Sequence, residues 1–74
     1  MTVKVKLFAS LREFGPEEQV MEIPEEGTIE EVVGRLKLPE KIPLLKVVNG
    51  EIRKIDYPLS EGDEVALFPP IGGG

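Results

Sequence analysis

Hydrophobic and polar positions alternate near both ends of the chain, which is the pattern of a strand with one buried face. In residues 3–8, two valines and a leucine alternate with two lysines, and Phe8 follows in the outward phase of the lysines. In residues 64–68, Val65 and Leu67 share one phase, and Ala66 and Phe68 share the outward phase. We therefore predict a strand at each end of the chain, and an exposed aromatic patch where the two strands lie side by side.

Three shorter strands are predicted between these ends. Residues 19–23 follow the first strand and are expected to pair with it in the antiparallel direction. Residues 44–48 and 51–55 flank Asn49-Gly50, a dipeptide that strongly favours a tight β-hairpin turn. The middle of the chain is thus expected to supply one hairpin and one further strand.

One main helix is predicted over residues 29–37, where apolar side chains recur at helical spacing. Thr28 and Glu31 have the spacing of a capping box, in which the threonine oxygen and the glutamate side chain each accept a backbone amide. Gly34 weakens this helix by about 1 kcal/mol relative to alanine, and close approach of a neighbouring element is one reason for a glycine there. Residues 9–15 are expected to form an irregular helical turn.

The predicted order is strand, strand, helix, strand, strand, strand. A helical connection is long enough for the first and last strands to pair in parallel at the centre of a sheet. We therefore predict the α+β class and a ubiquitin-like β-grasp, with a mixed sheet of about five strands packed on one main helix. Residues 1–70 are the expected domain. Residues 71–74 are the expected flexible glycine tail, which the stiff Pro69-Pro70 pair projects from the sheet.

The composition excludes many kinds of enzyme catalysis. The 74 residues contain no cysteine and no histidine, which excludes disulfides, a thiol nucleophile and the commonest general base. A net charge of −5 argues against nucleic acid as a partner and favours a protein with a basic face. No apolar run reaches the length of a membrane span, and the first residues lack the apolar stretch of a signal peptide. We therefore expect a cytoplasmic protein without membrane contact.

The charged residues are predicted to be surface features. Neighbouring acids such as Glu17-Glu18 point to opposite faces of a strand, so they do not converge on one ion, and no metal site is expected. A small basic set is expected to form a solvated sheet edge that resists pairing with another edge, with a docking role as the alternative. Its members are Lys41, Lys46, Arg53 and Lys54.

The last glycines offer chemistry that the rest of the chain lacks. Gly72, Gly73 and Gly74 have no β-carbon, so the narrow channel of a partner could approach their backbone closely. The Gly74 carboxylate is a poor electrophile until adenylation by ATP makes it an acyl donor. Because the chain has no glycine-rich phosphate loop between a strand and a helix, we expect it to bind no cofactor and another protein to activate it. A frayed terminus is the alternative that the tail alone leaves open.

Four stretches of the sequence are informative together. They are Phe8-Ala9-Ser10-Leu11-Arg12-Glu13, Val48-Asn49-Gly50, Pro58-Leu59-Ser60-Glu61-Gly62-Asp63-Glu64-Val65-Ala66 and Phe68-Pro69-Pro70-Ile71-Gly72-Gly73-Gly74. Each alone is a weak signal, and the second is the weakest. In combination they span the domain, and the chain resembles the MoaD/ThiS family of sulfur carriers, most closely its MoaD branch, the small subunits of molybdopterin synthase.

This resemblance implies a carrier that catalyses nothing itself. An E1-like enzyme would adenylate the Gly74 carboxylate with ATP and magnesium, and sulfur from a persulfide would replace AMP to leave a thiocarboxylate. The tail would then enter the MoaE-like large subunit of molybdopterin synthase, which builds the dithiolene of the molybdenum or tungsten cofactor. The docking surface of the family maps onto Phe8, Ile52 and Phe68, and continues into Pro69 and Pro70.

Other acceptors stay open at the level of the sequence. The short segment before Leu44 and the glycine at position 72 resemble the thiamine-type (ThiS-like) carriers, whose partner is a thiazole synthase. The Phe8-to-Glu13 segment and the Phe-Pro-Pro run favour the molybdenum branch. A ubiquitin-like modifier joined to lysines through Gly74 would begin with the same acyl-adenylate. A plain interaction module with a disordered end is the remaining alternative.

Overall fold

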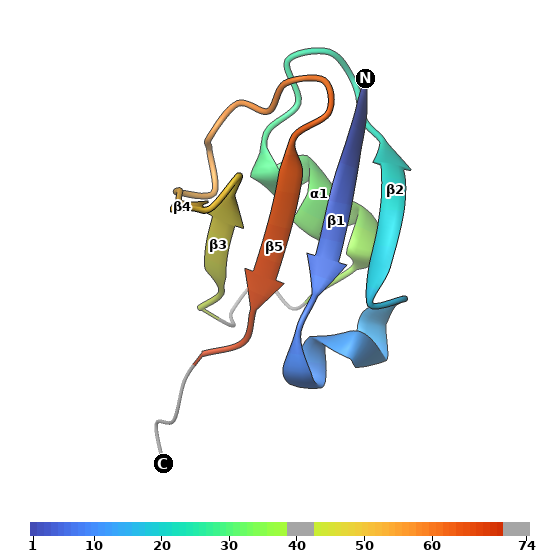
Figure 1. The fold of residues 1–74 in the computed structure, drawn as a ribbon, viewed down its shortest axis with the longest axis vertical. Helices are drawn as coiled ribbons and strands as arrows, with labels where there is room; N and C mark the ends of the chain where they lie inside the picture. Colours follow the sequence, from blue (N-terminus) through green and yellow to red (C-terminus); the bar gives the residue numbers. More distant parts are fainter. Residues whose placement is uncertain (39–42, 71–74) are drawn as a thin grey trace.

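The computed structural model describes residues 1–38 and 43–70, which form a five-stranded mixed sheet packed on one α-helix (Figure 1). Its elements are β1 (Thr2–Leu7), the short 3-10 helix η1 (Ala9–Phe14), β2 (Glu18–Glu22), α1 (Ile29–Leu36), β3 (Leu45–Val48), β4 (Glu51–Ile52) and β5 (Glu64–Phe68). The strands lie in the order β2-β1-β5-β3-β4. This arrangement confirms the predicted α+β class and the β-grasp.

The first and last strands form the centre of the sheet, as predicted. They run in parallel, with Val5 opposite Val65 and Leu7 opposite Leu67, while every other neighbouring pair in the sheet is antiparallel. The remaining predicted boundaries differ from the observed ones by one residue or so, except at β4. The central pair fixes where the two strands end, and therefore where Phe68 lies.

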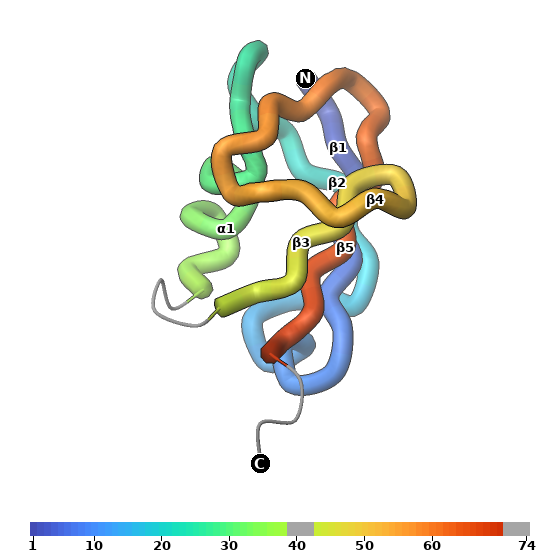
Figure 2. The backbone as a smooth tube through the Cα atoms, turned by 90° about the vertical axis from the view of Figure 1, so that its left-hand side faces the viewer, coloured from blue at the N-terminus to red at the C-terminus, as the bar shows by residue number. Residues whose placement is uncertain are grey.

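The core lies between the sheet and α1, which covers one face only (Figure 2). Alternate residues of β1 and β5 point into it, and the helix contributes the apolar stripe that its spacing predicts. The buried hydrophobic residues are Val3, Val5, Leu7, Leu11, Ile23, Ile29, Val32, Val33, Leu36, Leu38, Val48, Leu59, Val65 and Leu67. The opposite face of the sheet has no element over it in the described residues; it is called the outer face below.

The strand predicted over residues 51–55 is shorter in the structure. Only Glu51–Ile52 pair with β3, although the Arg53 amide still donates to the Lys46 carbonyl at 2.8 Å. After β4 the chain turns away from the sheet toward the start of α1 (Figure 2). The backbone of this segment bonds to the helix instead of extending the hairpin, so the prediction of a five-residue strand was wrong.

The predicted capping box is also wrong, and the same segment explains why. The side chain of Thr28 makes no capping hydrogen bond, although Thr28 does occupy the N-cap position. The amides of Ile29 and Glu30 donate to the carbonyls of Tyr57 and Ile55, at 3.2 and 3.0 Å. The first free amides of the helix are thus satisfied by backbone atoms from elsewhere in the chain.

Gly34 in α1 does not have the close neighbour that was considered as a reason for a glycine there. A β-carbon built on Gly34 would meet no atom within 4 Å, so no neighbouring element approaches it. The helix ends at Leu36, one residue before the predicted end, because Lys37 adopts the left-handed conformation with φ 58°. Nothing in the packing of the described residues therefore requires a glycine at position 34.

The Asn49-Gly50 turn forms as predicted, with both residues at positive φ (50° and 86°). Its asparagine also ties the turn to the start of β5. The Asn49 side-chain amide donates to Asp63 Oδ1 at 2.9 Å, and its Oδ1 accepts the Glu64 amide at 3.0 Å. The hairpin is thereby fixed to the strand that leads to the end of the described chain.

None of the helices in residues 1–38 and 43–70 is long and apolar enough to cross a membrane.

Candidate functional site

The outer face of the sheet carries the aromatic pair that the sequence predicts. Phe8 directly follows β1, and its amide donates to the Leu67 carbonyl at 3.2 Å. Its ring stacks on that of Phe68, with the centroids 4.3 Å apart and the planes 11° from parallel. Both side chains are half-buried, in part by each other, so they are less exposed than the sequence suggested. The aromatic patch exists, and it is a single stacked unit.

Strand register extends this pair into a larger apolar surface. Leu45 lies opposite Phe68, and Val47 lies opposite Ala66 on one side and Ile52 on the other. Opposite residues in a sheet share a face, so these side chains all lie on the outer face with Phe8. We call this set the outer-face patch: Phe8, Leu45, Val47, Ile52, Ala66 and Phe68.

Ile52 occupies the far end of the patch. It lies in one row with Val47 and Ala66, two strands and therefore about 10 Å from Ala66 by the usual spacing of strands. Its side chain is 70% exposed, and Val47 between the two is half-buried. The structure thus places all three sequence-predicted docking residues on one face, and adds Leu45, Val47 and Ala66. The phase shared with Phe68 could have found Ala66 from the sequence, whereas Leu45 and Val47 follow only from the pairing of β3 with β5.

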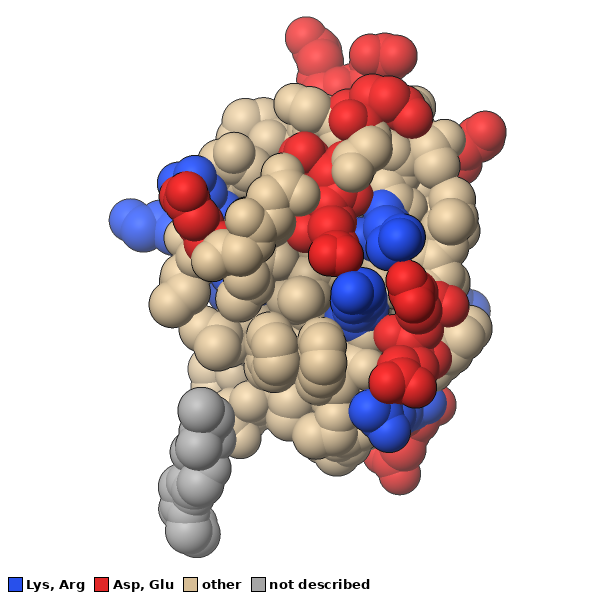
Figure 3. Space-filling view, in the orientation of Figure 1, with Lys and Arg blue, Asp and Glu red and all other residues tan. Residues whose placement is uncertain are grey.

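Charged residues border the patch on the side of β1 and β2. Lys4 and Lys6 project from the outer face of β1 and pair with Glu18 at 3.4 Å and Glu64 at 3.1 Å. The Glu64 carboxylate raises the pKa of Lys6, chiefly by accepting its hydrogen bond and also by its negative charge. Figure 3 shows the patch as an uncharged area low on this face, with the acidic and basic groups above it and to its right. The face therefore has an apolar half and an ion-paired half.

The chain leaves the sheet next to the patch. Pro69 is half-buried and Pro70 is exposed, directly after the stacked Phe68. Pro69 and Pro70 are the last described residues, so the predictions for Gly72, Gly73 and Gly74 lie outside the described part of the chain. A segment that continues beyond Pro70 starts beside the surface proposed for docking.

Comparison with known families decides where this arrangement belongs. The sequence profile of the ThiS family matches residues 5–74, which is nearly the whole chain. The chain belongs to the ThiS family. The resemblance to MoaD/ThiS carriers inferred from the sequence is therefore confirmed.

Individual relatives of this ThiS-family chain include sulfur carriers and modifiers. A 31-residue stretch is 55% identical to the molybdopterin synthase sulfur carrier subunit of Escherichia coli (strain K12), and it spans 42% of this chain and 38% of that relative. A putative molybdopterin converting factor subunit 1 from Pyrococcus furiosus is 29% identical, with a TM-score of 0.82 over 96% of this chain and 99% of the other. SAMP1, a small archaeal modifier protein of Haloferax volcanii, is 27% identical, with a TM-score of 0.79 over all of both chains. The family is thus one of small ubiquitin-like proteins.

Two basic residues of this ThiS-family chain depart from the solvated sheet edge that was predicted for the set. The Lys46 ammonium donates to the Leu44 carbonyl at 2.9 Å, and Arg53 pairs with Glu51 at 2.7 Å while it lies 4.7 Å over the Tyr57 ring. Two of the four are therefore held by contacts; Lys54 is exposed, and Lys41 lies outside the described residues.

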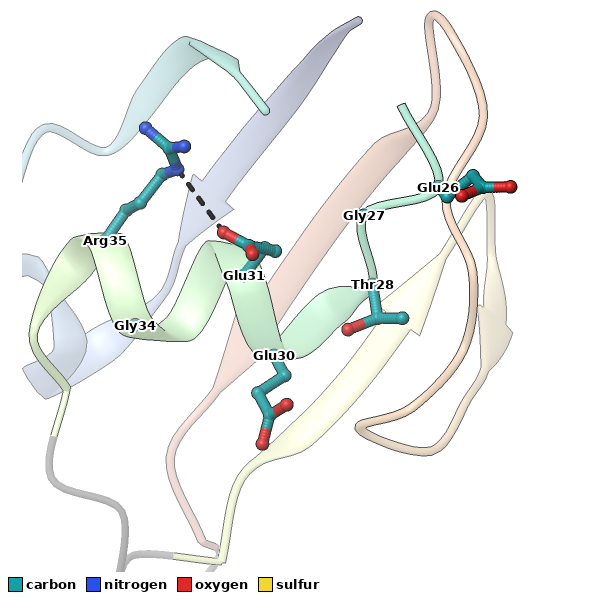
Figure 4. Close-up of a pocket in the computed structure, with 7 residues that line it drawn as sticks. All are labelled: Glu26, Gly27, Thr28, Glu30, Glu31, Gly34 and Arg35. Atoms are coloured by element: carbon teal, nitrogen blue, oxygen red, sulfur yellow. Dashed lines mark ion pairs between the residues drawn. The ribbon is translucent and has the colours of Figure 1, made fainter. Parts of the chain in front are cut away.

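A second feature of the ThiS-family chain is a shallow depression of about 470 Å³ at the start of α1 (Figure 4). Its side chains include Glu26, Glu30 and Glu31, and Glu31 pairs with Arg35 at 3.7 Å. Figure 4 shows Glu26 and Glu30 pointing away from each other, so their carboxylates do not converge. Among the described residues, no group of three or more acidic side chains is arranged to hold a metal ion.

Proposed function

We propose that this chain is a sulfur carrier whose terminal glycine, Gly74, is converted to a thiocarboxylate and donates its sulfur in molybdopterin biosynthesis. The observation that carries the proposal is the match of the ThiS family over residues 5–74, which includes the terminal glycines. The 31-residue likeness to the Escherichia coli sulfur carrier subunit supports molybdopterin as the end product. The chain itself would be a substrate and subunit, not an enzyme.

The chemistry needs an activating partner. An E1-like enzyme would bind ATP and magnesium and direct the Gly74 carboxylate onto the α-phosphorus, so that pyrophosphate leaves and an acyl-adenylate forms. A persulfide sulfur would then attack the acyl carbon and release AMP. A thiol would then attack the sulfur atom that still belongs to the persulfide donor. It would form a disulfide with the donor, and the thiocarboxylate would leave. Because the first step consumes ATP, we assign the reaction to the cytoplasm.

The outer-face patch suits the role of a docking surface for these partners. Apolar side chains that lie together on an exposed face, bordered by charged groups, usually mark a protein interface. The chain leaves β5 at Phe68, inside the patch, so a partner bound there would meet the following residues. We propose that the E1-like enzyme and a MoaE-like large subunit both use Phe8, Ile52 and Phe68, with Pro69 and Pro70 at the border.

Two alternatives have specific support. The profile that matches is named for ThiS, so the same observation also supports a thiamine-type carrier with thiazole synthase as its partner. The likeness to SAMP1 over the whole of both chains favours a modifier joined to lysines through Gly74. All three functions begin with the same acyl-adenylate, so they differ only in what receives the acyl group or its sulfur.

Mass spectrometry of the protein from its own cells tests these functions. A C-terminal peptide that is heavier by the difference between a sulfur and an oxygen atom supports a carrier. Peptides in which Gly74 is joined to a lysine of another protein support a modifier. Deletion of Gly74 is the matched control, since it should leave the fold unchanged and abolish sulfur transfer. If no E1-like enzyme of the source cell forms an adenylate on the chain, the carrier and modifier functions are all excluded.

A further inference from the structure

The guanidinium of Arg53 makes two contacts within the chain at the edge of β4. Its Nη2 donates to Glu51 Oε2 at 2.7 Å, and its Cζ lies 4.7 Å from the centre of the Tyr57 ring. The aromatic face below and the carboxylate beside it restrict the plane of the group. The side chain is still 37% exposed, so a partner can reach the guanidinium.

One donor of this group is not used. Arg53 Nε is buried and has no hydrogen-bond partner among the described residues. A buried donor without a partner is unfavourable, and a guanidinium binds a carboxylate best through two parallel N–H donors. Glu51 bonds to Nη2 alone, so its interaction leaves the two-donor mode of Arg53 unfilled.

Arg53 also lines a depression of about 460 Å³ beside β4. Its lining residues are Ile52, Arg53, Lys54, Asp56, Tyr57 and Pro58. Their formal charge is two positive and one negative, whereas the whole chain carries −5. Lys54 makes no ion pair with any part of the chain that the structure describes, so it adds an available cation.

The depression is continuous with the outer-face patch. Ile52 belongs to both, and it is the most exposed apolar side chain of the patch. A protein that covers Ile52 from the outer face therefore reaches Arg53 and Lys54 round the edge of β4. These two cations lie at the end of the patch opposite Phe8 and the ion-paired lysines of β1.

We propose that this depression binds one carboxylate side chain, Asp or Glu, of the E1-like enzyme that adenylates the chain. The incoming carboxylate displaces Glu51 and accepts from Nε and a terminal nitrogen of Arg53, after a small rotation that brings Nε to the surface. Lys54 adds a second charge. We name the activating enzyme because every function considered above begins with adenylation, and to that extent the inference rests on the proposed function.

Steady-state adenylation kinetics with the chain as the varied substrate test the inference. Arg53→Gln should raise KM about tenfold and leave kcat unchanged, since it removes a charged hydrogen-bonded contact and not the reacting group. The KM of the wild type should also rise more steeply with salt than that of the variant. Arg35→Gln is the matched control, because Arg35 has a similar ion pair, with Glu31, but lies on α1. It should leave KM and its salt dependence unchanged.

A structural role for Arg53 predicts a different result. If Arg53 only braces the segment that bonds to α1, Arg53→Gln will lower Tm and leave KM unchanged, which overturns the inference. Arg53→Lys should recover part of the lost affinity, because it keeps the charge without the two-donor geometry.

A titration that needs no enzyme separates failure of this inference from failure of the proposed function. Addition of N-acetyl-glutamate methylamide should shift the Arg53 Nε–H signal in NMR spectra in a saturable way. The glutamine analogue should not shift it. An unresponsive signal overturns the subsite even if the chain is adenylated, whereas a saturable shift in a chain that is never adenylated would retain the subsite and refute the proposed function.

Discussion

The ring of Phe8 stacks on the ring of Phe68 at a centroid distance of 4.3 Å, although the two residues lie at opposite ends of the chain. Parallel pairing of β1 and β5 brings them together, with Leu7 opposite Leu67 just before the pair. The stack lies on the outer face and its rings are half-buried, so it belongs to a surface and not to the core. Aromatic residues at a protein interface often contribute a large share of the binding free energy.

Phe68→Asp should weaken binding of the E1-like enzyme or the synthase large subunit by about 2 kcal/mol or more, because it places a charge in the centre of an apolar contact. The isolated domain should stay folded, since the buried neighbours Val65 and Leu67 are unchanged. Isothermal titration calorimetry measures the first effect, and circular dichroism the second.

Val20→Asp is a suitable control for this substitution. Val20 is 68% exposed and lies on the outer face opposite Lys4, on the charged half and outside the patch. It should leave binding nearly unchanged. Equal losses from the two variants would argue against the patch as the docking surface, and unfolding of Phe68→Asp would assign Phe68 to the core.

Thr28→Ala should cost less than about 0.5 kcal/mol of unfolding free energy, which is the lower end of the usual cost for removing a threonine N-cap. The side chain makes no capping bond, and backbone carbonyls of Ile55 and Tyr57 accept the first amides of α1. Urea unfolding monitored by circular dichroism measures the change. A loss of about 1 kcal/mol or more would mean that the threonine oxygen does cap the helix in solution.

The sequence allowed the central pair of strands and the hairpin to be predicted because its signals are local and consistent. Alternation marks the two central strands, Asn49-Gly50 marks the hairpin, and a helix of the right length separates them. The prediction of a capping box was wrong because it depends on a contact that is not local. Thr28 and Glu31 have the right spacing, but their competitor is a backbone segment nearly thirty residues away whose position no local pattern reports. The same segment shortened β4.

The residues of the outer-face patch were also predicted unevenly, because the pairing of strands decides which of them belong to it. Phe8 and Phe68 stand out in the sequence because each is an aromatic residue in the outward phase of a strand. Leu45 and Val47 do not stand out, since a short apolar strand gives no indication of which phase faces the core. The register of β3 against β5 decides which side chains face the core, and that register is a tertiary property. Arg53 was grouped with other cations by sequence, and only the fold places it over Tyr57.

Gly34→Ala should stabilise the protein by about 0.5–1 kcal/mol. Position 34 is exposed in the middle of α1, and a β-carbon there meets no atom within 4 Å. Alanine therefore gains helix propensity without a steric cost. Thermal and urea unfolding measure the gain, and sulfur transfer should be unaffected because α1 lies on the side of the sheet away from the outer-face patch. A loss of stability would indicate a contact at this position, and a loss of transfer would indicate that a partner approaches α1.

Asn49→Ala should be among the most destabilising substitutions outside the core, at about 2 kcal/mol. The asparagine adopts a positive φ of 50° that alanine disfavours, and its side chain bonds both to Asp63 and to the Glu64 amide. Asn49→Gly separates the two causes, because glycine accepts the backbone conformation and lacks the side chain. Asn49→Asp keeps the acceptor for the Glu64 amide but sets a second carboxylate against Asp63, so its loss should shrink when salt is added. If Asn49→Gly is as stable as the wild type, the side-chain bonds contribute little and the turn conformation alone accounts for the asparagine.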